Sequence, residues 1–231
     1  MRYAIISDIH GNLEALKKAL DYIEKIEVDH IVCLGDVVGY GPNPNECVEL
    51  VRIKCLFTVK GNHDAASVDL METFHMNKLA REAAIWTHER LTPQAKDFLI
   101  NLPLKTSIKN ATLVHASPHR PENWDYILTG FDAEPVFSHF ETPVCFIGHS
   151  HRPVEFTNNS TNQAAGDKRI INVGSVGQPR DKNPKLSFGI FNTESLDYEN
   201  IRLAYDVEKT AEKIYTEGLP SELAERLVYG L

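Results

Sequence analysis

Long uncharged apolar runs are missing from this sequence of 231 residues. No run approaches the roughly 18 residues that a membrane-spanning helix needs. The apolar stretch between Ala4 and Ser7 is also too short for the core of a signal peptide. We therefore expect a cytoplasmic protein without a membrane partner, and we interpret its first apolar stretch as a β-strand.

Cysteine is scarce, and the residues present form no Cys-x-x-Cys pair. They are Cys33, Cys47, Cys55 and Cys145, three of which lie in apolar stretches typical of buried strands. We expect reduced, buried thiols, in keeping with a cytoplasmic location.

Clusters of lysine or arginine are absent as well, and the net charge at pH 7 is -8. Long nucleic acids bind mainly to basic surfaces, so we do not expect one as a partner. A small partner fits this composition better, and a homo-oligomer is left open. The length and an apolar fraction of 42% suit a single domain over residues 1–231.

Strand and helix patterns alternate in the first part of the chain. An apolar run at 3–7 precedes Leu13, Leu16 and Leu20, which recur at helical spacing. Further strands are expected at 31–34 and 55–59, with a turn-rich loop and a helix at about 45–52 between them. Residues 77–100 are expected to be helical, with a second helix beginning at Thr92-Pro93.

Short strand candidates dominate after Leu102-Pro103. They lie at 106–108, 112–115, 144–147, 154–157, 169–173, 186–191 and 201–204, with a polar hairpin loop over 158–168 and closing helices from about 206. We assign these strands to a second sheet. Because each sheet must bury two faces, the pattern predicts an α/β fold, a four-layer α-β-β-α sandwich of two mixed sheets.

Carboxylates, imidazoles and one amide repeatedly occupy the first positions after a predicted strand. They are Asp8, His10, Asp36, Asn62, His115, His149 and His151. Strand ends are where α/β proteins bind ligands. Each residue alone has an ordinary structural explanation, but together they favour a metal site.

Two pairs among these residues have a spacing suited to chelation. Asp8 and His10 are separated by one residue, as are His149 and His151. In an extended strand this spacing puts both side chains of a pair on one side. Oxygen and nitrogen donors without thiolate suit Mn²⁺, Fe, Zn²⁺, Co²⁺ or Ni²⁺.

The ordered blocks Asp-x-His, Gly-Asp, Gly-Asn-His-Asp, His and Gly-His-x-His resemble the calcineurin-like metallophosphoesterases over most of the chain. The segments 113–118 and 172–180 resemble those of small prokaryotic phosphodiesterase-like members. The resemblance implies a metal-dependent phosphoesterase of the same sandwich fold, with a phosphodiesterase favoured. Two divalent metal ions would activate a hydroxide that attacks phosphorus in line with the leaving group.

The resemblance also implies a role for each donor. Asp8, His10 and His151 would hold one metal ion, Asn62, His115 and His149 the other, and Asp36 would bridge the two. His63, which is not counted as a ligand, would stabilise the charge of the transition state or protonate the departing oxygen. The catalytic residues are therefore expected to be His63 and Asp36.

One position departs from the resemblance. Related protein phosphatases and diadenosine tetraphosphatases carry Gly-Asp-x-x-x-Arg-Gly, whereas Tyr40 stands here in the place of that arginine. A tyrosine hydroxyl cannot bind a phosphate bidentately as a guanidinium does, so protein phosphatase activity is disfavoured. Arg120 and Arg180, in loops that follow strands of the site, are possible replacements.

Several roles stay open from the sequence. Asp64 either orients a histidine or caps the short segment after the turn, and Asn12 is expected to cap the first helix. The aromatic loop of His119, Trp124 and Tyr126 either stacks on a base or packs beneath the loop. His75 lies outside the ligand pattern and is interpreted as a surface or structural residue.

Two alternative functions are kept. The first is a nucleotide or dinucleoside-polyphosphate hydrolase that uses the aromatic loop as a base platform. The second is a non-catalytic protein-binding scaffold of the same fold. The full set of donors argues against the scaffold, because a decayed site should have lost some of them.

Overall fold

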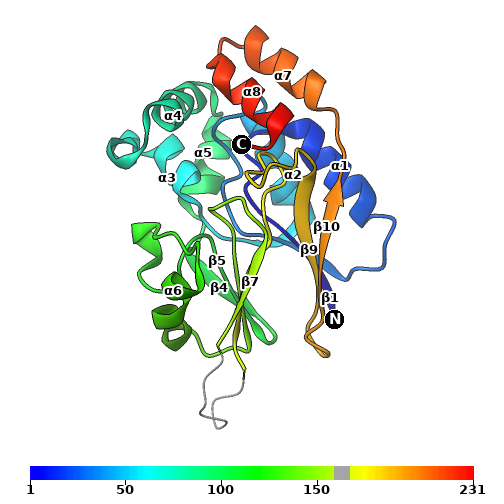
Figure 1. The fold of residues 1–231 in the computed structure, drawn as a ribbon. Helices are drawn as coiled ribbons and strands as arrows, with labels where there is room; N and C mark the ends of the chain where they lie inside the picture. The colour runs from blue at the N-terminus through cyan, green and yellow to red at the C-terminus, as the bar shows by residue number, and fades with distance from the viewer. Residues whose placement is uncertain (159–166) are drawn as a thin grey trace.

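The computed structural model describes residues 1–158 and 167–231, and it contains two five-stranded sheets packed face to face (Figure 1). Hydrophobic clusters lie on the outer face of each sheet, beneath helices, and between the sheets. The predicted four-layer α-β-β-α sandwich is confirmed. Among the described residues, no helix is both long enough and apolar enough to cross a membrane.

The first sheet has the order β10-β9-β1-β2-β3. Its strands are β1 (Arg2–Ile6), β2 (His30–Cys33), β3 (Cys55–Thr58), β9 (Leu186–Asn192) and β10 (Tyr198–Leu203). β1, β2 and β3 are parallel, and β9 is antiparallel to both β1 and β10. The prediction that the last two strands belong to the second sheet is therefore wrong, since β9 and β10 lie in the first.

β9 joins the first sheet because both of its faces are buried there. Phe188 and Ile190 pack toward the helices outside the sheet, while Phe191 packs between the sheets. An apolar run of this kind predicts a buried strand, but it does not predict the sheet to which the strand belongs. β9 belongs to the first sheet because it pairs antiparallel with β1, with Ile5 opposite Gly189.

The second sheet has the order β4-β5-β6-β8-β7. Its strands are β4 (Lys105–Ile108), β5 (Ala111–Val114), β6 (Val144–Ile147), β7 (Val154–Thr157) and β8 (Arg169–Asn172). β5, β6 and β8 are parallel, and β4 and β7 form antiparallel edges. The hairpin loop expected over 158–168 falls largely outside the described residues.

The helices lie outside the two sheets, and some of them cover the outer faces (Figure 1). They are α1 (Leu13–Ile23), α2 (Pro44–Lys54), α3 (Asn62–Val68), α4 (Lys78–Arg90), α5 (Pro93–Ile100), α6 (Gly130–Ala133), α7 (Val207–Thr216) and α8 (Ser221–Tyr229), with 3₁₀ turns η1 (Leu70–His75), η2 (Pro121–Asn123) and η3 (Glu134–His139). α1, α2 and α5 pack on the first sheet, and α6 and η3 on the second. The sequence did not predict α3 or η1.

The space between the sheets is filled by alternate residues of the strands. Tyr3 and Ile5 of β1 point into this layer, whereas Ala4 and Ile6 point toward the helices. This is the period of two that an extended strand imposes.

The four cysteines are free. Cys33, Cys47 and Cys145 are buried, as expected, whereas Cys55 is partly exposed.

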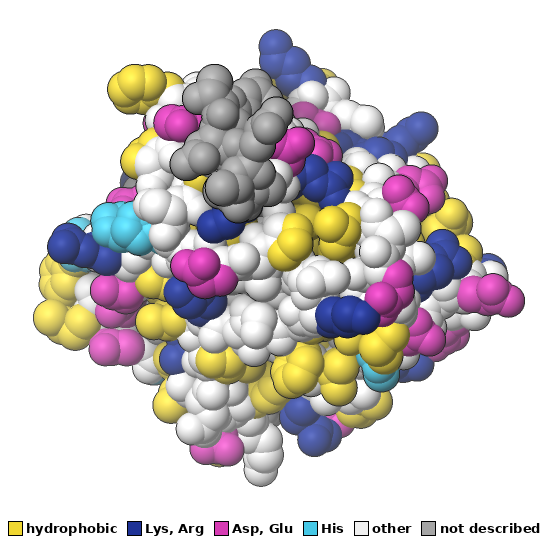
Figure 2. Space-filling view, turned by 90° about the horizontal axis from the view of Figure 1, so that it is seen from below, with side chains coloured by type: hydrophobic (Ala, Val, Ile, Leu, Met, Phe, Trp, Pro, Cys, Tyr) yellow, Lys and Arg dark blue, Asp and Glu magenta, His cyan; other side chains and the backbone are white. Residues whose placement is uncertain are grey.

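The face shown in Figure 2 carries acidic and basic side chains interspersed with apolar ones. No continuous patch of lysine and arginine is visible among the residues described on this face (Figure 2).

Candidate metal centre

The predicted donors lie in the loops that follow parallel strands of both sheets. Asp8 and His10 follow β1, Asp36 follows β2, and His115 follows β5. His149 and His151 follow β6, and Asn62 begins α3 shortly after β3. Since parallel strands end at the same edge of a sheet, these loops meet where the two sheets adjoin.

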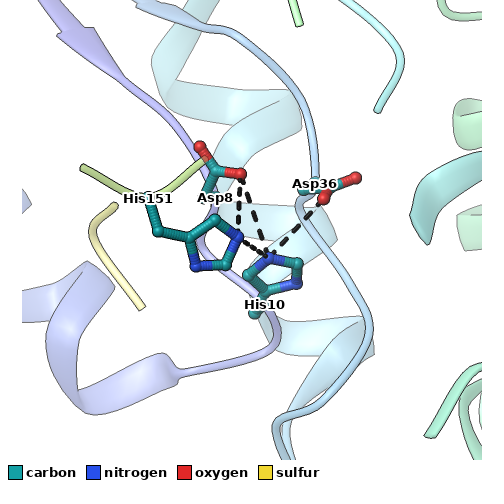
Figure 3. A group of neighbouring side chains, drawn as sticks. All are labelled: Asp8, His10, Asp36 and His151. Carbon is teal, nitrogen blue, oxygen red and sulfur yellow. Dashed lines mark hydrogen bonds and ion pairs between the residues drawn. The ribbon is translucent and has the colours of Figure 1, made fainter. Parts of the chain in front are cut away.

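A first group of donors brings together four buried side chains from three loops. Asp8, His10, Asp36 and His151 each offer one ligand atom, and these atoms all lie within 4.8 Å of one another. The side chains point toward one another in Figure 3. Nε2 of His151 is 3.1 Å from Nε2 of His10 and 3.3 Å from Oδ1 of Asp8.

A second group adjoins the first through a shared carboxylate. Asp36, His115 and His149 offer ligand atoms that also lie within 4.8 Å of one another. Oδ2 of Asp36 is 3.3 Å from Nε2 of His115 and 3.5 Å from Nε2 of His10. Asp36 is thus common to both groups.

Several polar atoms at this centre are buried without a hydrogen-bond partner among the described residues. They are Oδ2 of Asp36, Oδ1 of Asn62, Nε2 of His115 and Nε2 of His149. A buried polar atom without a partner costs about 1–3 kcal/mol, so such groups are rare unless a ligand satisfies them. The donors present therefore fit divalent metal ions.

Backbone carbonyls orient three of the imidazoles. Nδ1 of His10 is 3.1 Å from the carbonyl oxygen of Val38, and Nδ1 of His115 is 2.8 Å from that of Leu34. Nδ1 of His151 is 2.6 Å from the carbonyl oxygen of Gln178. A proton donated from Nδ1 leaves the Nε2 lone pair directed into the centre, as metal-binding histidines require.

Burial and mutual charge shift the pKa values of the centre. Burial raises the pKa of Asp8 to about 7. Burial alone would raise the pKa of Asp36 too, but His115 and other neighbouring imidazoles hold it well below its usual range. Burial lowers the pKa of His149 to about 3, so this ring is neutral at pH 7, the form that binds metal.

The expectation that the chelating pairs lie on extended backbone is wrong. Asp8 and His10 both have φ of 52°, and His149 and His151 have φ of 65° and 59°. The reason is that β1 ends at Ile6 and β6 at Ile147, so the donors lie in tight loops beyond the strands. Left-handed backbone at non-glycine residues is uncommon and concentrates at functional sites.

Asp64 holds the loop that carries Asp36. Its carboxylate accepts hydrogen bonds from the backbone N–H groups of Asp36 and Val37 at 2.8 and 2.9 Å, and from that of Gly61 at 3.0 Å. The hydrogen bond from Gly61, the N-cap residue, caps α3. Of the two roles considered for Asp64, the structure therefore shows capping. Asn12 likewise caps α1, accepting from the N–H of Ala15 at 3.1 Å.

Close approach explains one glycine of the centre. A Cβ on Gly61 would lie 2.0 Å from Oδ1 of Asp36 and 2.4 Å from its backbone nitrogen. Only glycine lets the start of α3 approach the Asp36 loop this closely.

Tyr40 and Arg180 lie beside the first donor group. The Tyr40 ring is buried, with its centroid 4.3 Å from that of His63 and 4.8 Å from that of His10. The Arg180 guanidinium is 5.5 Å from the Tyr40 centroid and donates to Oε1 of Gln178 at 2.7 Å. Arg120 is exposed. Of the two arginines considered from the sequence, Arg180 is the one placed at the centre.

A cavity of about 570 Å³ opens beside the second donor group. Asn62, His63 and His149 lie at its inner end, and Tyr40, Trp124 and Tyr126 contribute aromatic walls. The Tyr126 ring stacks on His149 with centroids 4.0 Å apart. His119 instead packs against His139, with centroids 4.1 Å apart.

Further residues of the cavity come from η1 and its surroundings. They are Glu72, His75, Met76, Asn77 and Ala80, and the lining also includes Glu122, Asn123 and Asp125. Sequence reasoning missed this wall and treated His75 as an unrelated residue. No strand end or apolar period marks the segment, so only its position in the fold reveals it.

Known proteins are similar in sequence to most of this chain. The calcineurin-like phosphoesterase superfamily domain matches residues 1–196. An uncharacterized protein from Methanocaldococcus jannaschii is 40% identical over 98% of this chain and 97% of its own. The phosphodiesterase YfcE from Escherichia coli is 24% identical over 85% of this chain and 90% of its own.

A solved structure has the same fold over the whole chain. The metallophosphoesterase from Sphaerobacter thermophilus aligns with a TM-score of 0.88 and 37% identity, covering 100% of this chain and 99% of that one. Together with the domain match, this similarity shows that the chain belongs to the calcineurin-like phosphoesterase superfamily.

Proposed function

We propose that this protein is a two-metal phosphoesterase that hydrolyses phosphodiesters. One observation carries the proposal: two groups of buried donors share the Asp36 carboxylate and leave its Oδ2 without a hydrogen-bond partner among the described residues. A carboxylate between two imidazole-rich groups suits a pair of adjacent divalent ions.

The donors divide between the two ions. Asp8, His10 and His151 would hold one ion, Asn62, His115 and His149 the other, and Asp36 both. Their mixture of nitrogen and oxygen atoms suits Mn, Fe, Zn, Co or Ni. When bound, such ions lower the pKa of a water molecule and polarise the phosphoryl oxygens.

His63 would act on the phosphate or on the leaving group. Its backbone N–H donates to Oδ1 of Asp36 at 2.9 Å, which fixes the ring beside the shared carboxylate. Burial lowers the pKa of His63 to about 4, so its imidazole is neutral at pH 7 in the metal-free protein. We therefore assign it the role of a neutral N–H donor to an oxygen that gains charge in the transition state.

Arg180 would supply positive charge for the phosphate. Its guanidinium is held over the Tyr40 ring and by Gln178. A diester carries a single negative charge and needs less cationic support than a monoester or a polyphosphate. With Tyr40 in the place of the arginine found in related phosphatases, the centre favours diesters.

Substrate profiling tests the proposal. Metal-free protein reconstituted with Mn²⁺ is assayed with bis(p-nitrophenyl) phosphate, p-nitrophenyl phosphate and diadenosine tetraphosphate. We expect the highest kcat/KM with the diester. A higher value with the tetraphosphate would favour the nucleotide hydrolase, and no turnover of any ester by metal-loaded protein would favour the scaffold.

A further inference from the structure

The cavity beside the metal centre is lined by exposed carboxylates as well as by residues of the centre. Three of its lining residues are carboxylates: Glu72 from η1, Glu122 from η2, and Asp125. They are exposed, and none forms an ion pair or a side-chain hydrogen bond with another described residue. Lysine and arginine are absent from the described lining of the cavity.

Arg180 lies behind the inner end without lining the cavity. Its guanidinium is 5.5 Å from the centroid of the Tyr40 ring, and Tyr40 lines the cavity beside His63. Asn62 Oδ1, His63 Nδ1 and His149 Nε2 are buried there without partners among the described residues. The inner end thus suits the phosphate, and the outer part suits the group esterified to it.

Aromatic rings line the same space as the carboxylates. Tyr40, Trp124 and Tyr126 all face the cavity, and the Tyr126 ring is stacked on His149. Aromatic faces attract ammonium groups, and nearby carboxylates add Coulomb attraction. The same carboxylates repel the additional phosphates of a dinucleoside polyphosphate.

We propose that this cavity binds the alcohol part of a phosphodiester in which that alcohol carries a positively charged ammonium group. The proposal rests on the function proposed above and names the substrate class for it. In the reaction, a water oxygen bonds to phosphorus, the P–O bond to the amino alcohol breaks, and a proton from the water ends on the alcohol oxygen.

Three matched diesters test the proposal. Each joins methyl phosphate to a second alcohol, which is choline, its neutral isostere 3,3-dimethylbutan-1-ol, or the anionic 4-hydroxybutanoate. Release of methyl phosphate by Mn²⁺-loaded protein is followed by ³¹P NMR. We expect kcat/KM for the choline ester to exceed that for the neutral ester by about tenfold, with the anionic ester slowest. Equal or faster cleavage of the neutral ester would overturn the proposal.

Removing the charges of the three cavity carboxylates tests whether they cause the preference for the choline ester. In the triple variant Glu72→Gln, Glu122→Gln, Asp125→Asn, the ratio of kcat/KM for the choline ester to kcat/KM for the neutral ester should fall to about twofold or less. A matched control, Asp21→Asn, Glu89→Gln, Glu141→Gln, alters exposed carboxylates that do not line the cavity and should keep the preference. An unchanged preference in the first triple variant would contradict the assignment.

A binding measurement separates this inference from the proposed function. The chain has two tryptophans, so Trp86→Phe leaves Trp124 as the only one. Choline should change the Trp124 emission saturably, and 3,3-dimethylbutan-1-ol at the same concentration should not. If no phosphoester is hydrolysed but choline binds in this way, the proposed function fails and the cavity assignment stands. No saturable response to choline would overturn the cavity assignment.

Discussion

Asp36 is the residue on which the two donor groups depend, because its carboxylate belongs to both. Asp36→Asn keeps the side-chain shape and an acceptor for the His63 N–H, but it removes the charge. We expect loss of bound metal and a fall in kcat of at least about 100-fold. Metal analysis and turnover check both effects. Asp29→Asn, which alters an exposed carboxylate that belongs to neither donor group, serves as the control. Full metal content in Asp36→Asn would refute the shared role.

A substitution of His63 should lower catalysis without affecting metal binding. Its ring packs against Tyr40, and neither donor group includes it. His63→Gln should therefore retain the metal content of the unmodified protein while kcat falls by about 10²–10⁴. His30→Gln, at the start of β2, is the comparison variant. Loss of metal together with activity in His63→Gln would mean that the ring is a ligand or supports one.

The sequence predicted which donor residues lie close together, but it did not predict their backbone conformation. The seven donors follow strands, and the structure gathers six of them into two groups, with Asn62 adjacent and its Oδ1 buried without a partner among the described residues. Their left-handed conformations have no signature in residue type, since Asp and His adopt them only where surrounding contacts impose them. That these residues bind metal stays a prediction.

The C-terminal helices support the centre from outside. α7 and α8 form a hydrophobic cluster that includes Tyr40, whose ring touches His10 and His63. Thr210 of α7 also donates to Oδ1 of Asn12 at 3.1 Å. These contacts join the end of the chain to the loops that follow β1 and β2.

Shortening a buried side chain of α8 should be costly. Leu223 is fully buried in this cluster, at 0% exposure. We expect Leu223→Ala to lower the free energy of unfolding by about 2–5 kcal/mol. Val228→Ala on the same helix, where the side chain is 50% exposed, should change it by at most about 0.5 kcal/mol. Urea unfolding compares the two, and similar effects would contradict the packing described here.

Elements with strong periodicity were predictable, and those defined by tertiary contact were not. α1 buries Leu13, Leu16, Leu20 and Ile23 on one face, as their spacing indicates. α3 and η1 are short and lack a repeating apolar pattern. β9 was recognised as a strand, yet its sheet depended on pairing with β1, a contact between the two ends of the chain.

For the whole molecule, the pKa values of the centre predict how stability depends on pH without metal. Burial lowers the pKa of four histidines below the usual 6.5: His10, His63, His149 and His151. Between about pH 4.5 and 6 the unfolded chain therefore binds protons that the folded protein does not. Asp8 and Asp64 act oppositely, because burial raises the pKa of each to about 7.

The histidines outnumber these carboxyl groups, so the free energy of unfolding should rise with pH over this range. Above about pH 6.5 it should fall again, because Asp36 raises the pKa of His115 to about 9 against the effect of burial, and the folded protein then keeps a proton that the unfolded chain loses. Urea unfolding in the presence of a chelator, at a series of pH values, measures this dependence. A steady decrease from pH 4.5 to 6 would show that the buried histidines are not neutral.

The central claim is that the shared Asp36 carboxylate joins two metal sites into one hydrolytic centre. Titration of metal-free protein with Mn²⁺, with binding and hydrolysis of bis(p-nitrophenyl) phosphate followed on the same samples, tests it most directly. We predict saturation at two ions per chain, with activity that reaches its plateau at the same ratio. Saturation at a single ion, or two bound ions without any hydrolysis, would contradict it.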